Sequence, residues 1–540
     1  MFLSTLSLAF LSCSGDEVVS VEYIDHGEVL CEAPVEGIER FSEQAVERGI
    51  TPDPITTEMS PYGIPSGLTL AAVDGDNDGD IDLFFPSLRG HPQVYENDGS
   101  GNFRPGPYSS AGTTLPEDTM PFSLVDMNGD DLPDLITFAF QGVLFAPNLG
   151  GLRFGPNTAV FAYEPDNSAL VVTGNWGDAD GDGDLDLFIP RMDLFSAEQE
   201  SLLPEPSFDL LLLNHEGGLL LGGQYGLAEG MPGLSMSATF TDRDADGDQD
   251  ILVLSDGAQF GLPRSSFYTN NSLEGELALE DIAAEIGTDV AVSGMGVDVV
   301  DINGDGVFDY CYTDLSQPDC LVSVESDRYV LAGRSLGLIA PPMEENQSWS
   351  GWSIDVVDYD NDGLLDAAAS AGFGFEARVS DGLDYNYQPN ALWRGVEGGG
   401  FDYVEGAIGA HADTHHYGMV SADLDGDGYL ELLFSGPDSE VLAYWNACGA
   451  GAWLEVDLRG LPVNRMGYGA RVEVVAGDEI ATREMGNLRT FSQGPGRLHF
   501  GLGDVEEVDL RVAWPDGTVT EIDEVPTRRR VTVLHPDAEE

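Results

Sequence analysis

Residues 178–186 read DADGDGDLD, with aspartate at every second position and glycine at the fourth and sixth. Six more segments follow this nine-residue design: DGDNDGDID from Asp74, DMNGDDLPD from Asp126, DRDADGDQD from Asp242, DINGDGVFD from Asp301, DYDNDGLLD from Asp358 and DLDGDGYLE from Asp423. Ca²⁺ prefers roughly six to eight oxygen ligands, and acids on alternate residues of a tight loop point toward one centre. The repetition therefore predicts an array of up to seven calcium-binding loops.

The seven segments, numbered here as loops 1 to 7 in chain order, each supply candidate metal ligands at positions 1, 3, 5, 7 and 9. In loops 1 to 4 these are Asp74, Asp76, Asp78, Asp80 and Asp82; Asp126, Asn128, Asp130, Leu132 and Asp134; Asp178, Asp180, Asp182, Asp184 and Asp186; and Asp242, Asp244, Asp246, Asp248 and Asp250. In loops 5 to 7 they are Asp301, Asn303, Asp305, Val307 and Asp309; Asp358, Asp360, Asp362, Leu364 and Asp366; and Asp423, Asp425, Asp427, Tyr429 and Glu431.

Departures from the pattern are local. Position 6 is glycine in six copies, where it permits a positive φ, but Asp131 stands there in loop 2. Asn128 and Asn303 replace carboxylates at position 3, and Glu431 replaces the last aspartate. Because loops 2 and 5 carry one formal charge fewer, we expect them to bind calcium more weakly than the others.

The surroundings of the loops exclude an EF-hand. That motif would place a bidentate glutamate at position 12 between two helices. Here position 12 is hydrophobic or small, as at Phe85 and Val253. The flanking runs, such as 68–73 and 81–85, are short and rich in apolar residues, which predicts strands. Each loop should therefore connect two neighbouring strands.

The spacing of the loops indicates the architecture. Their first residues lie 52 to 65 positions apart, and a repeat of this length is typical of a propeller with one four-stranded blade per repeat. The last repeat stops after residues 442–446, short of its final strand, and the missing phrase appears at 38–41. We therefore predict an all-β, closed seven-bladed propeller over residues 38–447, in which Phe41 completes the blade of Asp423.

These repeats resemble the FG-GAP/VCBS family, the calcium-loop blades of integrin α-subunit propellers and of many bacterial exported proteins. Residues 448–540 resemble the UnbV/ASPIC domain, which follows such a propeller in the cartilage acidic protein family. The matching residues include the segments 464–472, 498–503 and 512–517, together with Gln493. Alternating apolar residues in 472–475 and 508–512 predict strands of a small β-sandwich or barrel.

The charge is strongly negative. The net charge is −74, and all 22 basic residues are arginine. Nucleic acid is excluded as a partner because binding it needs a basic surface, and anionic membranes are disfavoured for the same reason. Ten of the 22 arginines fall in residues 448–540. We therefore expect the basic face of this tail to dock on the acidic propeller.

The amino-terminal residues favour export. Residues 1–12 predict a signal peptide of lipoprotein type with Cys13 lipidated, and a plain cleaved signal is the alternative. Residues 13–37 would then be a linker on a protein of the cell surface, the outer membrane, the periplasm or the medium. The remaining four cysteines allow three pairings, of which we favour Cys311 with Cys320 and Cys31 with Cys448.

Signals for catalysis are weak. His411 and His415 could bind zinc on a helix, but the glycine in this segment and the strand that follows favour a polar loop. Neither a GxSxG elbow nor a GxxxxGK phosphate loop occurs. We predict no catalytic residues and expect a monomer that recognises an extracellular protein or glycan. A propeller-class polysaccharide lyase or hydrolase and a scaffold of a surface assembly remain alternatives.

Overall fold

The computed structural model describes residues 23–538, with gaps at 32, 36–39, 55–68, 88–90, 108–120, 140–141, 164–169, 193–207, 216–217, 226–234, 257–263, 273–276, 326–327, 346, 373–387, 409–414, 438, 478 and 487. The predicted signal peptide, Cys13 and His411 lie outside the described residues. None of the described helices is long and apolar enough to cross a membrane.

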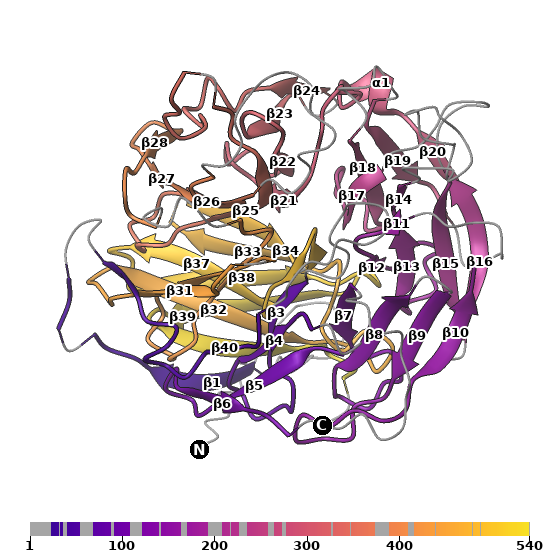
Figure 1. The fold of residues 1–540 in the computed structure, drawn as a ribbon, viewed down its shortest axis with the longest axis horizontal. Helices are drawn as coiled ribbons and strands as arrows, with labels where there is room; N and C mark the ends of the chain where they lie inside the picture. The colour runs from indigo at the N-terminus through magenta and orange to yellow at the C-terminus, as the bar shows by residue number, and fades with distance from the viewer. Residues whose placement is uncertain are drawn as a thin grey trace, which may run out of the picture.

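Seven antiparallel sheets among the described residues each contain one of the loops, and we number them as blades 1 to 7 (Figure 1). Blades 1 to 3 comprise β3 (Leu70–Val73), β4 (Asp82–Phe85), β5 (Gln93–Asn97) and β6 (Phe103–Pro105); β7 (Phe122–Val125), β8 (Asp134–Ala139), β9 (Gly142–Ala146) and β10 (Thr158–Ala162); and β12 (Asn175–Gly177), β13 (Asp186–Ile189), β15 (Asp209–His215) and β16 (Gly218–Tyr225).

Blades 4 to 7 comprise β17 (Ser235–Thr241), β18 (Asp250–Ser255), β19 (Ser266–Asn270) and β20 (Leu279–Asp281); β21 (Val297–Val300), β22 (Asp309–Tyr312), β23 (Asp319–Glu325) and β24 (Arg328–Leu331); β25 (Gly351–Val357), β26 (Asp366–Ala371), β27 (Ala391–Gly395) and β28 (Phe401–Tyr403); and β29 (Gly418–Ala422), β30 (Glu431–Ser435), β31 (Leu442–Asn446) and β2 (Phe41–Glu43). A short pair, β11 (Leu170–Val171) with β14 (Arg191–Met192), and the single turn α1 (Ala283–Ile286) complete this part.

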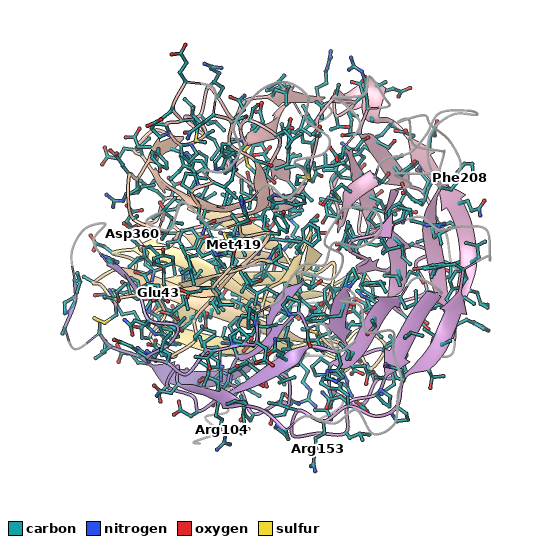
Figure 2. The ribbon with its side chains drawn as sticks, viewed as in Figure 1. Glu43, Arg104, Arg153, Phe208, Asp360 and Met419 are labelled. Atoms are coloured by element: carbon teal, nitrogen blue, oxygen red, sulfur yellow. A yellow bond between two sulfur atoms is a disulfide. The ribbon has the colours of Figure 1, made fainter. Side chains whose placement is uncertain are left out.

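The core of the propeller lies between the blades. The first strands of blades 1, 2, 6 and 7 are buried along their whole length, because neighbouring sheets cover both of their faces. Each pair of neighbouring blades shares a buried apolar cluster. The cluster between blades 7 and 1 joins Leu433 and Trp445 to Leu83 and Phe85, so the last blade packs against the first. Figure 2 accordingly places Met419 of β29 inside the molecule, and Arg104 and Arg153 at its edge.

The closing strand lies where the sequence predicts it. β2 pairs antiparallel with β31, with Phe41 opposite Asn446 and Glu43 opposite Tyr444. The outer strand of blade 7 therefore comes from the amino-terminal part of the chain. The prediction for Phe41 is confirmed.

A second unit, which we call the carboxy-terminal unit, contains two four-stranded sheets. One is β1 (Tyr23–Glu28), β40 (Arg529–Leu534), β32 (Ala452–Arg459) and β37 (Arg497–Gly503); the other is β34 (Glu479–Glu484), β33 (Arg471–Ala476), β38 (Glu507–Ala513) and β39 (Val519–Pro526). Both sheets contribute to one apolar core, which includes Val456 and Val512. The strands predicted over 472–475 and 508–512 are present.

Two features of this unit differ from the expectations. β1 falls within the predicted linker 13–37, yet its residues Tyr23–Glu28 pair with β40. The hairpin of β35 (Leu488–Arg489) and β36 (Ser492–Gln493) leaves the unit and pairs in parallel with β3 of blade 1. In both cases the strand supplies backbone partners to an edge that would otherwise be open.

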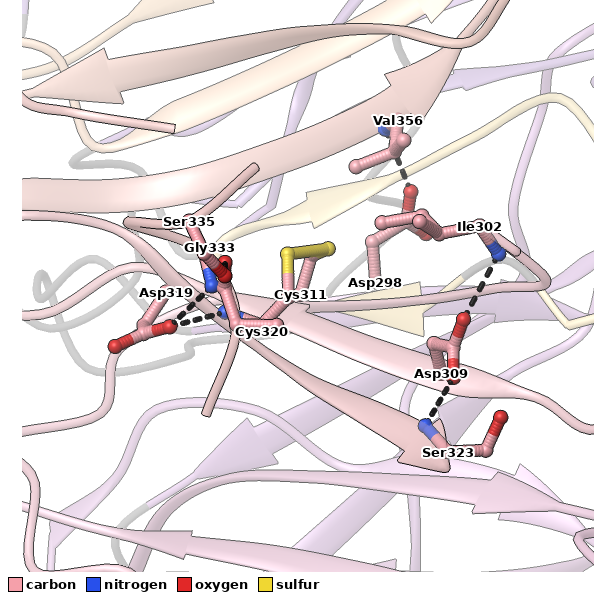
Figure 3. Close-up of a disulfide and its surroundings, with 11 residues drawn as sticks. Asp298, Ile302, Asp309, Cys311, Asp319, Cys320, Ser323, Gly333, Ser335 and Val356 are labelled. Atoms are coloured by element: carbon pink, nitrogen blue, oxygen red, sulfur yellow. Dashed lines mark hydrogen bonds between the residues drawn. A yellow bond between two sulfur atoms is a disulfide. The ribbon is translucent and has the colours of Figure 1, made fainter. Parts of the chain in front are cut away.

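Both predicted disulfides are present. Cys31–Cys448 joins positions 417 residues apart and ties the segment between β1 and β2 to the junction of the two units. Cys311–Cys320 links neighbouring strands of blade 5, where both side chains are fully buried (Figure 3). Disulfides persist in oxidising compartments, so this pairing fits an exported protein.

Candidate functional site

The first aspartate of each loop fixes the turn. In loop 3, Asp178 Oδ1 accepts hydrogen bonds from the N–H groups of Gly181 and Asp182 at 2.8 and 3.2 Å, and Oδ2 accepts one from Gly183 at 2.9 Å. In all seven loops the N–H groups of positions 5 and 6 donate to this aspartate. Gly183 has a φ of 94°, so glycine suits the turn at position 6.

The carboxylate at position 9 ties the loop to its blade. In loop 5, Asp309 accepts hydrogen bonds from Ile302 N–H at 2.9 Å and from Ser323 N–H on the third strand at 2.7 Å (Figure 3). The third strands of the other blades donate to position 9 in the same way. This residue therefore sets the distance between the loop and the sheet.

Five loops bring three carboxylates together, with one oxygen of each within 4.8 Å of the others. These groups are Asp74, Asp76 and Asp78; Asp178, Asp180 and Asp186; Asp242, Asp244 and Asp246; Asp358, Asp360 and Asp366; and Asp423, Asp425 and Glu431. Within the described residues, loops 2 and 5 form no such group, because Asn128 and Asn303 occupy position 3. The Leu, Val and Tyr residues at position 7 could offer only a main-chain carbonyl.

The chemistry of the donor set fits a hard cation. At position 3, Asp76, Asp180, Asp360 and Asp425 each keep a buried Oδ1 that accepts no hydrogen bond within the protein. A buried carboxylate oxygen without a partner is costly. Four loops repeat the same unsatisfied atom at the same position, where an ion held by the neighbouring acids would satisfy it.

The pKa values of the loop carboxylates also favour a bound cation. Burial, followed by repulsion from neighbouring acids, raises the pKa of Asp82 to about 8 and that of Asp186 to about 8. Burial likewise raises the pKa of Asp178 to about 6. A cation at the centre of the loop would oppose both causes and favour the charged carboxylates.

An arginine already bridges two acids of loop 6. Arg394 on β27 places Nη2 2.9 Å from Asp360 Oδ2 and 2.7 Å from Asp362 Oδ2. This guanidinium neutralises part of the charge that a metal would otherwise balance. Loop 6 therefore differs from loop 3, where no described arginine lies within 4 Å of a carboxylate oxygen.

A repeated asparagine links consecutive blades. Asn148, which lies just after the third strand of blade 2, donates from Nδ2 to Gly75 O in loop 1 at 2.8 Å and to Pro133 O in its own loop at 2.9 Å. Equivalent bonds run from Asn97 to Leu424 O, from Asn270 to Ala179 O and from Asn446 to Tyr359 O. This role was not predicted from the sequence, although an asparagine recurs at the end of β5, β19 and β31 and just after β9.

The carboxy-terminal unit covers the loops. Arg530 donates to Gly79 O of loop 1 at 2.6 Å, and Arg471 donates to Gly306 O of loop 5 at 2.5 Å. Further contacts reach loop 4 through Glu484 and Asp242 N, loop 6 through His499 and Asn361, and loop 7 through Trp453 and Gly428. Val463 lies near Gly183 of loop 3, where a side chain at position 183 would meet it. Since all loops join first and second strands, they share one face of the propeller.

Asp131, the residue that departs from the glycine pattern, belongs to this interface. It adopts a φ of 71° and lies 2.6 Å from Arg465 Nε and 3.3 Å from Arg459 Nη2. With these two arginines, loop 2 also meets the carboxy-terminal unit. The positive φ is unfavourable for a residue with a side chain, and the two ion pairs offset it.

The hairpin β35–β36 occupies the centre of the propeller. Gln493 exchanges hydrogen bonds with the backbone of Leu124 in blade 2, and the ring of Phe491 lies 5.4 Å from that of Trp352 in blade 6. Arg489 Nη2 lies 3.0 Å from Asp298 Oδ1 and 2.7 Å from Asp355 Oδ1, on the first strands of blades 5 and 6. Ion pairs of the predicted kind therefore join the two units.

The histidine segment is structural where it is described. His416 is 1% exposed, its Nδ1 lies 3.1 Å from Asn390 Nδ2, and its Nε2 lies 3.2 Å from Glu440 O. His415 bonds Ser439 through its backbone N–H. These contacts hold a loop of blade 7, and the zinc alternative rests on His411, which lies outside the described residues.

Comparisons with known proteins agree with this architecture. A profile described as an FG-GAP-like repeat matches residues 74–137, which span loops 1 and 2. A profile described as ASPIC and UnbV matches residues 460–540. These two parts of the chain are similar to an FG-GAP-like repeat and to the ASPIC and UnbV family.

Curated relatives of the chain include cartilage acidic protein 1 of several vertebrates. The chain is 27% identical over 259 residues to cartilage acidic protein 1 of Xenopus tropicalis, which covers 46% of the chain and 37% of that relative. It is 28% identical over 299 residues to cartilage acidic protein 1 of Homo sapiens, covering 45% of the chain and 44% of that relative. The matched part is therefore less than half the length of these relatives.

Solved structures that align with the chain include a lectin and a propeller. An Agrocybe aegerita lectin, described as recognising non-reducing terminal N-acetylglucosamine, aligns with a TM-score of 0.40 at 16% identity, over 64% of this chain and 81% of the lectin. The Dos1 propeller aligns with a TM-score of 0.39 at 9% identity, over 74% of this chain and 95% of its own.

Proposed function

We propose that the chain is an exported, calcium-stabilised, seven-bladed propeller that recognises a protein or glycan ligand and catalyses no reaction. The observation that carries the calcium part is the unsatisfied Oδ1 at position 3 of four loops, each surrounded by further carboxylates. When bound, calcium would supply the positive charge that lets these acids stay ionised while buried. Positions 1, 3, 5 and 9 would hold it through side chains, and position 7 through its carbonyl.

Recognition is the function that this arrangement supports best. The loops of the propeller face are engaged by the carboxy-terminal unit, and the centre is filled by the hairpin β35–β36. Trp349 and Trp352 are each 1% exposed and belong to the core. The buried histidine and tryptophan side chains are therefore used in packing, and the rigid scaffold remains as a support for ligand-binding loops.

The calcium part is tested by removing the metal. Elemental analysis of the purified full chain should find up to seven calcium ions, and EDTA should lower the melting temperature steeply. A ligand that binds only the folded state stabilises it by about 2.7 kcal/mol per site at a hundred times its Kd. Calcium should restore the melting temperature and magnesium should do so poorly, because magnesium demands a tight octahedron.

A variant gives the matched control. Substituting Asp178, Asp180 and Asp182 by Asn should remove one ion, whereas substituting the exposed Asp516 of the carboxy-terminal unit should remove none. An unchanged melting curve in EDTA, together with no calcium by elemental analysis, would contradict the proposal. Recognition itself is tested by a glycan array and a protein pull-down carried out in calcium.

A further inference from the structure

The propeller has a second face, opposite the loops. β4 begins at Asp82, the last residue of loop 1, and ends at Phe85, so Phe85 lies at the end of the blade away from the loop. β30 runs in the same sense from Glu431 at loop 7 to Ser435. Residues that follow these strands therefore lie on the face that the carboxy-terminal unit leaves uncovered.

A groove opens on this second face between blades 7 and 1. It has a volume of about 580 Å³, which is in the range of ligand sites. Its floor is apolar and contains the buried side chains of Ile50, Phe85 and Leu442. Val46 stands at the rim with 74% of its surface exposed. Val441 in the wall is also partly exposed, so the groove offers solvent-accessible apolar groups at Val46 and Val441 above a buried apolar floor.

The rim of the groove is acidic. Glu43, Asp53 and Glu440 line it and are exposed, and its lining among the described residues contains no arginine. The chain as a whole has a net charge of −74. Such a site attracts cationic groups and repels anionic ones.

The walls of the groove are held in place by hydrogen bonds. Gln93 accepts from Asp53 N–H at 2.7 Å and donates to Asp53 O at 3.0 Å. On the other side, Ser439 Oγ accepts from His415 N–H at 2.9 Å, and His416 Nε2 lies 3.2 Å from Glu440 O. Because the walls need little ordering upon binding, the entropy cost of occupying the groove is small.

The lining distinguishes between classes of ligand. Among the described residues of its lining, Phe85 is the single aromatic one and is only 1% exposed, so the described lining offers no ring that could stack on a sugar. An apolar floor with a carboxylate rim fits a protein segment instead. We infer that the groove between blades 7 and 1 binds a segment in which an apolar side chain is flanked by lysine or arginine. This inference deepens the proposed recognition function and rests on it.

The test uses the full chain in calcium and a phage-displayed library of random twelve-residue peptides. The enriched sequences should contain an apolar residue next to lysine or arginine. Val46→Arg adds bulk and positive charge at the rim, so it should weaken the selected peptides at least about tenfold, equal to 1.4 kcal/mol. Val519→Arg is the matched control, because Val519 is 44% exposed on β39 of the carboxy-terminal unit.

A charge variant separates the two parts of the inference. Glu440→Gln should weaken binding of the selected peptides in low salt and change it less in high salt, because it removes one rim charge. Enrichment of acidic peptides, no enrichment, or equal binding to the Val46→Arg and wild-type proteins would overturn the inference. So would a glycan-array signal that Val46→Arg abolishes, since it would assign the groove to a sugar.

Failure of the inference about the groove can be distinguished from failure of the proposed recognition function. A protein or glycan ligand that binds the Val46→Arg variant as well as the wild type would retain recognition and place it elsewhere. A melting temperature that does not depend on calcium would contradict the calcium-binding loops. It would leave the inference about the groove intact, because the groove lies on the opposite face.

Discussion

Replacing Arg489 by Met should strongly destabilise the folded protein. The guanidinium lies between Asp298 and Asp355 at the centre of the propeller, and the three side chains are 18%, 9% and 3% exposed. Burial opposes the charge on Arg489, but the two aspartates outweigh this effect and raise its pKa. Burial also raises the pKa of Asp298, even with the arginine beside it.

The expected loss of unfolding free energy follows from the buried charges that remain after the substitution. Methionine retains the apolar stem but removes the guanidinium that pairs directly with both buried carboxylates, and leaves Arg483 as a more distant positive charge. Removing one side of a buried ion pair costs roughly 3–5 kcal/mol, which is large against a typical total stability of about 5–15 kcal/mol. The triple variant Arg489→Met, Asp298→Asn, Asp355→Asn removes the uncompensated charge and should recover most of the loss.

The assay is urea unfolding in saturating calcium, followed by tryptophan fluorescence, since Trp352 contacts the hairpin. Arg511→Met is the control, because Arg511 lies 2.8 Å from Glu473 but is 41% exposed. An exposed pair of this kind contributes about 0–1 kcal/mol. If the Arg489 and Arg511 variants lose equal stability, or if the triple variant is less stable than the single one, the reasoning is wrong.

Three further outcomes are expected. Asp82 and Asp186 have pKa values raised to about 8 by burial and neighbouring acids, whereas an unfolded aspartate titrates near about 3.9. The metal-free folded state therefore holds more protons than the unfolded state between these values, and its stability should fall as the pH rises from about 4 to about 8. Calcium replaces these protons, so added calcium should raise the melting temperature more at pH 8 than at pH 6, and an equal rise would contradict this. Arg394→Gln should tighten calcium binding at loop 6 in titration calorimetry, because it removes a competing cation, whereas weaker binding would show that the arginine supports the site. Cys31→Ser should lower the unfolding free energy by about 2–5 kcal/mol under non-reducing conditions, and an unchanged urea midpoint would show that strand pairing alone holds the amino-terminal segment.

The parts of the fold that were predictable are those written in local repeats. The spacing of the aspartates within each loop predicts its turn, and the apolar segments on either side of the loop predict the two strands. The closure by Phe41 was predictable because the last repeat lacks a strand that the amino-terminal segment supplies. The disulfide between Cys31 and Cys448 followed from the same closure, whereas the one between Cys311 and Cys320 followed from their closeness in the sequence.

The parts that were missed depend on contacts distant in sequence. Tyr23–Glu28 forms a strand because it pairs with the edge of β40. The segment belongs to no sequence repeat, so no pattern predicts this strand. The hairpin of Leu488–Arg489 and Ser492–Gln493 has strands of two residues, too short for a periodic signal. Asp131 departs from the glycine pattern of loop 2, and its role depends on Arg459 and Arg465, which are distant in the sequence.

The two amino-terminal strands impose an order on folding. β1 completes a sheet of the carboxy-terminal unit, and β2 completes blade 7, so each of them pairs with a segment that is synthesised long after it. Contacts between such distant segments form slowly, and open strand edges invite wrong pairing in the interval. During synthesis, β2 therefore stays unpaired until β31 (Leu442–Asn446) has been made, and β1 until β40 (Arg529–Leu534) has been made. Deleting β1 and β2 together would leave both blade 7 of the propeller and one sheet of the carboxy-terminal unit without an outer strand.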